Sequence, residues 1–124
     1  MTHQNTPILD DRDLTSEERD LIRWMLENGN KGGRKFLGQL ERARVHARCP
    51  CGCASIDLTI DGKTPTDFRM HILGDFQWKN EAGNLFGAFV FEQDGLLGGL
   101  DLWSVDGAET PSAIPRPEQL VSLE

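Results

Sequence analysis

The sequence predicts an α+β fold in which two N-terminal antiparallel helices pack on one face of a mostly antiparallel sheet of about five strands. The apolar residues repeat with a period of 3.6 over residues 16–44 and with a period of 2 over residues 45–105, and turn signals separate the runs. A chain of 124 residues has the size of one domain. We therefore predict a single domain with a flexible N-terminal arm at residues 1–13 and a proline-rich C-terminal tail at residues 108–124.

The two helices are predicted from a start signal and from two apolar stripes. Thr15 and Glu18 have the spacing of a capping box, so the first helix should begin at residue 16 and end before Gly29. Its apolar residues are Leu21, Ile22, Met25 and Leu26. The glycine-rich segment 28–33 should reverse the chain into a second, antiparallel helix. The apolar stripe of that helix consists of Phe36, Leu37, Leu40 and Ala43.

Five strands are predicted from alternating side chains. They cover residues 45–49, 55–61, 68–78, 85–91 and 96–105. Because alternate side chains of a strand point to opposite faces, Ile56, Ile72 and Leu100 should face the helices and Trp103 should face away. Asp94-Gly95 is typical of a two-residue hairpin turn, and Gly74 predicts a bulge within its strand.

Three blocks of the sequence resemble a small uncharacterised bacterial family, a domain of unknown function. Residues 14–19 read Leu-Thr-x-Glu-Glu-Arg, residues 48–56 read Arg-Cys-x-Cys-Gly-Cys-x-Ser-Ile, and residues 97–107 read Leu-x-Gly-Leu-x-x-x-Ser-x-Asp-Gly. Asp101 stands where such proteins carry Glu, which is a conservative departure. The resemblance implies one domain that opens with a helix pair, and it implies no activity.

The charge and the N-terminal sequence restrict the partners and the compartment. Thirteen Lys and Arg stand against twenty Asp and Glu, a net charge of −7, which disfavours nucleic acids and anionic membranes as partners. Residues 1–13 contain no apolar run, so neither a signal peptide nor a membrane span is expected there. We therefore expect a cytoplasmic protein whose cysteines stay reduced.

Cys49, Cys51 and Cys53 offer the most recognisable chemistry of the chain. Three thiolates in one turn could bind zinc, with His46 or His71 as a fourth ligand, although strand alternation places His46 opposite Cys49. Reduced cysteines that fill a corner of the core are the structural alternative. A redox sensor is a further alternative, because Arg48 would lower the pKa of a neighbouring exposed thiol.

No motif of a known catalytic site is present, so we predict a protein that is not an enzyme and needs no cofactor. The face opposite the helices should carry Trp103 among polar residues, which is typical of a protein-binding surface. We predict a cytoplasmic interaction domain of immunity type that binds a basic protein partner through Trp103, Asp101, His71 and Asp57. The alternative is a small zinc-binding domain. Residues 85–91 are apolar on both faces, which also permits a homodimer.

Overall fold

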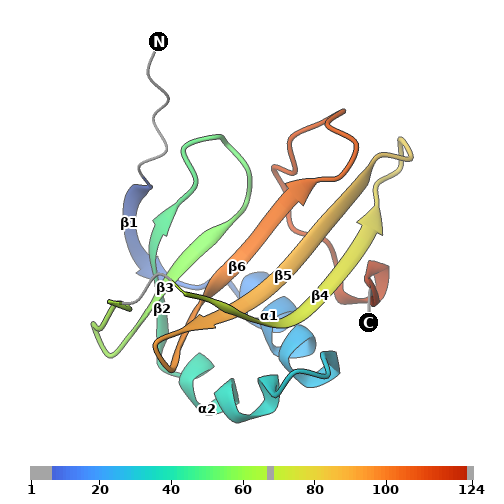
Figure 1. Cartoon of the computed structure of the whole chain (residues 1–124). Helices are drawn as coiled ribbons and strands as arrows, with labels where there is room; N and C mark the ends of the chain where they lie inside the picture. Colours follow the sequence, from blue (N-terminus) through green and yellow to red (C-terminus); the bar gives the residue numbers. More distant parts are fainter. Residues whose placement is uncertain (1–6, 67–68, 123–124) are drawn as a thin grey trace.

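Seven strands form one antiparallel sheet in the computed structural model, which describes residues 7–66 and 69–122 (Figure 1). The strands are β1 (Ile8–Asp13), β2 (Ala43–Arg48), β3 (Ile56–Ile60), β4 (His71–Lys79), β5 (Leu85–Gln93), β6 (Leu96–Ser104) and β7 (Val121–Ser122). Their order in the sheet is β1-β2-β3-β6-β5-β4-β7. The helices are α1 (Ser16–Asn28) and α2 (Leu37–Leu40), with 3₁₀ turns η1 (Gly33–Phe36) and η2 (Pro117–Gln119).

The predicted fold, two N-terminal helices on a sheet of five strands, is wrong. The five expected strands correspond to β2–β6, but the segments predicted as an arm and a tail supply β1 and β7. Strand β1 contains an Asp/Arg run without apolar alternation, so its sequence carries no strand signal. It is held instead by its ladder to β2 and by ion pairs from Arg44 of β2 to Asp11 and Asp13.

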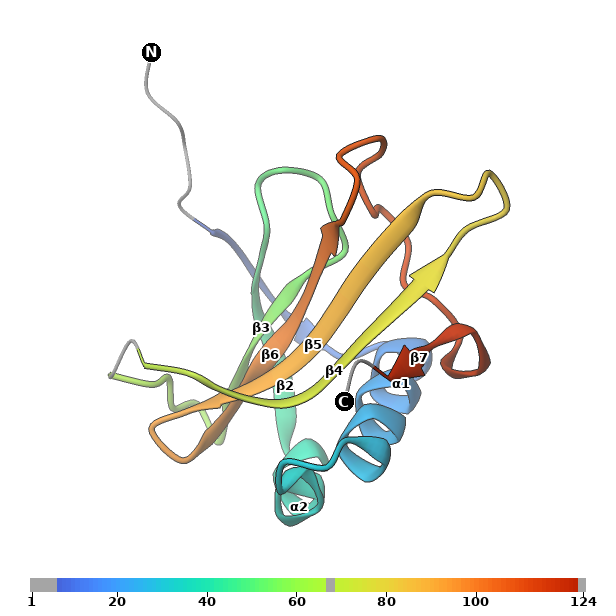
Figure 2. The ribbon, with the colours of Figure 1, turned by 45° about the vertical axis from the view of Figure 1, so that its right-hand side comes forward.

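Helix α1 begins and ends at the predicted residues, because both ends carry clear local signals. The Thr15 side chain accepts from the Glu18 N–H, and the Glu18 carboxylate accepts from the Thr15 N–H, so the capping box is confirmed. The buried side of α1 packs across β4 and β5 (Figure 2).

The second helix is much shorter than predicted. Its apolar stripe begins in the 3₁₀ turn η1, only Leu37–Leu40 is α-helical, and Ala43 already belongs to β2. One helical turn is enough to bury the apolar side chains of this segment, because Phe36 and Leu40 already reach the core. No helix among the described residues 7–66 and 69–122 has the length and apolar character to cross a membrane.

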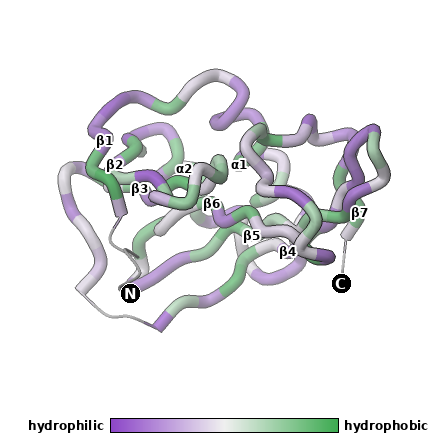
Figure 3. Tube along the Cα trace, turned by 90° about the horizontal axis from the view of Figure 1, so that it is seen from above, coloured by the Kyte–Doolittle hydropathy of each residue, from purple (hydrophilic) through white to green (hydrophobic). Residues whose placement is uncertain are grey.

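Alternation correctly places most of the core, and it fails at a bulge. Ile56 and Leu100 lie in the hydrophobic core, whereas the side chain of Trp103 is 42% exposed and lies outside it. The ladder of β4 with β5 shifts register between Ile72 and Gly74, so Leu73 enters the core in place of Ile72. Phe68, expected on the same face as Ile72, lies outside the described residues. Buried apolar and more exposed polar residues alternate along β3, and Figure 3 shows the hydropathy along the trace.

Candidate metal centre

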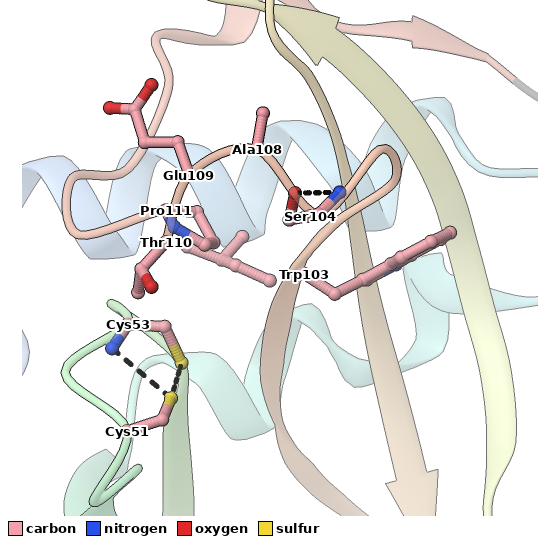
Figure 4. A pocket seen from close by; sticks show the side chains of 10 residues that line it. Cys51, Cys53, Trp103, Ser104, Ala108, Glu109, Thr110 and Pro111 are labelled. Atoms are coloured by element: carbon pink, nitrogen blue, oxygen red, sulfur yellow. Dashed lines mark hydrogen bonds between the residues drawn. The ribbon is translucent and has the colours of Figure 1, made fainter.

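The three cysteines lie in the loop that joins β2 to β3. Gly52 has φ 91°, a left-handed conformation that favours glycine and lets the loop reverse within a few residues. The Ala54 N–H donates to the Pro111 carbonyl at 2.9 Å, which ties the loop to the C-terminal tail. Local turn chemistry and this tether together place Cys51 and Cys53 on the same side of the loop (Figure 4).

The sulfur atoms of Cys49, Cys51 and Cys53 converge. All three Sγ atoms lie within 4.8 Å of one another, and the Cys51 and Cys53 sulfurs are 2.9 Å apart. The backbone N–H groups of Cys51 and Cys53 donate to the sulfurs of Cys49 and Cys51, each at 3.4 Å. Such N–H···S bonds stabilise negative charge on sulfur, as they do around bound metals.

The pKa values of the Cys49 and Cys51 thiols are shifted in opposite directions. Burial, and then the hydrogen bond with the Cys51 side chain, raise the pKa of Cys49 to about 12. Burial also acts against ionisation of Cys51, but hydrogen bonds from the neighbouring thiols and backbone N–H groups outweigh it and lower the Cys51 pKa. Cys51 therefore loses its proton more readily than Cys49.

The sulfur spacing fits a thiolate metal site. A metal at about 2.3 Å from each sulfur requires sulfurs about 3.8 Å apart in a tetrahedron, which lies between the 2.9 Å of the close pair and the 4.8 Å upper limit of the cluster. Small side-chain rotations would therefore suffice. Neither predicted fourth ligand is in place: His46 lies near Asp57, and His71 pairs with Glu92 of β5.

A cleft of about 450 Å³ adjoins the cysteines. It is lined by Cys51 and Cys53, by Trp103 of β6, and by residues 107–111 of the tail (Figure 4). The carboxylate of Glu109 points away from the sulfurs, and it accepts hydrogen bonds from the side chains of Asn80 and Asn84. The chain therefore offers three thiol ligands and leaves a further coordination position for a group in the cleft.

No family model, no curated protein and no solved structure matches the chain. The resemblance to an uncharacterised bacterial family therefore stays a prediction, and the function has to be argued from the geometry.

The predicted binding residues occupy two separate places. Asp57, Asp101 and Trp103 lie on the face of the sheet that points away from α1, which we call the outer face. His71 lies apart from them, at the start of β4, where its ring contacts the Glu92 carboxylate.

Sequence reasoning missed Ser55, which connects the cysteines to the outer face. This buried hydroxyl accepts from the Leu102 N–H at 2.8 Å and donates to the Asp101 carboxylate at 3.0 Å, and the Cys53 thiol lies 3.3 Å away. The only signal was the position of Ser55 where the loop enters β3, which does not distinguish a network residue from an ordinary polar one.

We expect Asp57→Asn to stabilise the domain at neutral pH by about 0.5 kcal/mol, because like charges on neighbouring strands repel. Burial, and then the nearby Asp101 carboxylate, raise the pKa of Asp57 above its ordinary 3.8. A raised carboxyl pKa means that the native state gains stability as the pH falls through it, so the gain of the variant should shrink in acid. Urea unfolding at several pH values measures this, with the exposed Asp20→Asn as the control. A loss of stability at neutral pH would contradict the expectation.

Proposed function

We propose that this chain is a small cytoplasmic domain that binds a thiophilic metal ion, zinc in the first place, through Cys49, Cys51 and Cys53. The observation that carries the proposal is the convergence of three sulfur atoms to within 4.8 Å within the five residues 49–53. Thiolates prefer Zn²⁺, Cu⁺ and related ions over Mg²⁺ or Ca²⁺. The cytoplasm is the compartment that would keep the three thiols reduced.

The arrangement supports an open site rather than a closed structural one. A structural zinc site has four protein ligands, whereas a site with three ligands keeps a position for water or for an incoming ligand. Cys51 is exposed, so an ion bound there would remain accessible from the cleft. The backbone N–H groups of Cys51 and Cys53 would act around the sulfurs, where they would orient the thiols and offset thiolate charge.

Metal titration of the purified, reduced protein tests the proposal. Co²⁺ should bind with a stoichiometry of one per chain and produce the sulfur-to-cobalt charge-transfer absorption of a thiolate site, and Zn²⁺ should displace it. Because the chain contains only three cysteines, the variant with all three replaced by serine should lose this absorption completely. Cys51→Ser alone should weaken Co²⁺ binding by at least about 100-fold.

The alternative outcomes are distinct. Binding that survives in the triple serine variant would place the metal elsewhere and overturn the proposal. Reduced protein that binds no Co²⁺ but loses two thiols on mild oxidation would favour a redox function of the same cysteines. Thiol counting with a maleimide reagent separates these cases, and far-UV circular dichroism shows whether each variant is folded.

A further inference from the structure

The outer face of the sheet presents exposed aromatic surface. Both helices and the turn η2 lie on the opposite side (Figures 1 and 2). Trp103 and Phe89 of neighbouring strands lie on the outer face with 42% and intermediate exposure, and the Phe89 and Phe91 rings have centroids 5.9 Å apart. An aromatic residue left exposed on a sheet face is a common anchor of protein contacts.

Gly87 fixes how the indole of Trp103 lies. Gly87 is the cross-strand partner of Trp103, and a Cβ atom at this position would come within 2.4 Å of the indole ring. The ring therefore lies directly on the backbone of β5, with its other side toward solvent. This arrangement makes a flat aromatic surface of the kind on which a planar cation stacks.

Carboxylates border this surface, and the imidazole of His46 lies near one of them, Asp57. Phe89 has Asp101 as its cross-strand partner on β6, and Asp57 lies diagonally beyond on β3. The described arginine ion pairs lie elsewhere, on β1, β2 and α1, in the turn between α2 and β2, and beside η2. Among residues 7–66 and 69–122 no arginine or lysine pairs with Asp57 or Asp101. Burial, and then repulsion by the Asp101 carboxylate, raise the pKa of Asp57.

We propose that the outer face binds an arginine-bearing segment of a basic protein partner, with one guanidinium stacked on Trp103 and a second guanidinium of the same segment paired with Asp57 and Asp101. A guanidinium is planar, it stacks on aromatic rings, and it donates two parallel hydrogen bonds to a carboxylate. The ammonium group of lysine is not planar and cannot donate two parallel hydrogen bonds to one carboxylate, so arginine should be preferred. The net charge of −7 also steers a basic partner toward this chain. This site is separate from the cysteine cluster and does not require a metal.

Fluorescence anisotropy with a labelled octa-arginine peptide tests the proposal. The affinity for this peptide should exceed that for octa-lysine by several-fold, and the Asp57→Asn/Asp101→Asn variant should bind octa-arginine at least about 10-fold more weakly. The matched control is Glu17→Gln/Asp20→Asn, which removes the same charge from the exposed side of α1 and should change the affinity less than about 2-fold. Trp103→Ala should weaken binding, and Trp103→Phe should restore part of it.

Equal losses in the two double variants would show unspecific attraction and overturn the proposal. Asp57→Asn alone keeps the bond between Ser55 and Asp101, so it tests the site even if Asp101→Asn disturbs the fold. Sedimentation of the free protein examines the other occupant, a second copy of the chain: a dimer that Trp103→Ala dissociates would also overturn it. Octa-arginine binding should persist in the triple serine variant, which separates this result from the metal proposal.

Discussion

Glu18→Ala is expected to lower the free energy of unfolding by about 3 kcal/mol, the scale of losing a helix cap together with one partner of a buried ion pair. The Glu18 side chain is buried and accepts two hydrogen bonds of 2.9 Å from the Arg12 guanidinium. It also accepts a hydrogen bond from the N–H of Thr15, the N-cap residue of α1. One carboxylate thus joins β1 to α1, and alanine would remove all three bonds.

The same contact predicts how stability depends on pH. Burial opposes ionisation of Glu18, but the hydrogen bonds from Arg12 and from the cap outweigh it and hold the pKa of Glu18 below its ordinary 4.5. A lowered carboxyl pKa contributes stability that is fully present above pH 4.5 and is lost as the pH falls through the folded-state value. Chemical unfolding of wild type and variant between pH 7 and strongly acidic pH measures both effects.

The neighbouring Glu17 provides the control for Glu18. Glu17 is exposed in the same helical turn, and its substitution by alanine should cost only about 0.5 kcal/mol through the helix dipole. If Glu17→Ala and Glu18→Ala had equal effects, the contact with Arg12 would contribute nothing beyond the helix dipole.

Gly29→Ala is the second change with a large expected effect, a loss of about 3 kcal/mol. An added Cβ would lie 2.4 Å from the Leu73 carbonyl oxygen and 2.9 Å from the Gly74 Cα. Both atoms belong to the backbone of β4, so no side-chain rotation can relieve the overlap. The end of α1 would have to move away from the bulge in β4 on which it rests.

Gly38 offers a matched control for Gly29. It lies within α2, and a Cβ there would have no neighbour within 4 Å. Gly38→Ala should therefore stabilise the domain by up to about 1 kcal/mol through the helix preference of alanine. Thermal unfolding of both variants measures the contrast. Similar shifts for the two would mean that the helix end adapts without cost.

The parts of the fold that could be predicted from the sequence are those fixed by local chemistry. The capping box at Thr15 and the two-residue turn at Asp94-Gly95, where both residues have positive φ and β5 pairs with β6, depend on neighbouring residues alone. Strand β1 could not be predicted, because its ion pairs come from Arg44, more than thirty residues away. The bulge was expected at Gly74. That Leu73 and not Ile72 points into the core depends on the register of β4 with β5, which tertiary pairing decides.

The same distinction between local sequence and tertiary pairing applies to the candidate sites. The spacing of Cys49, Cys51 and Cys53 in one loop indicates the sulfur cluster directly, because a short loop leaves few ways to separate them. Strand alternation already placed His46 opposite Cys49, whereas the position of His71 beside Glu92 could not be predicted, since it depends on how β4 pairs with β5. The aromatic surface depends on the cross-strand pairing of Gly87 with Trp103, which no local pattern encodes.

The hydrogen bond from Ala54 to Pro111 couples the order of the cysteine loop to the docking of the tail. Such coupling is reciprocal. An ion that orders the loop would also favour the docked tail, and an undocked tail would weaken the binding of that ion. A change that loosens the tail at Pro111 should therefore also loosen the loop that carries the cysteines.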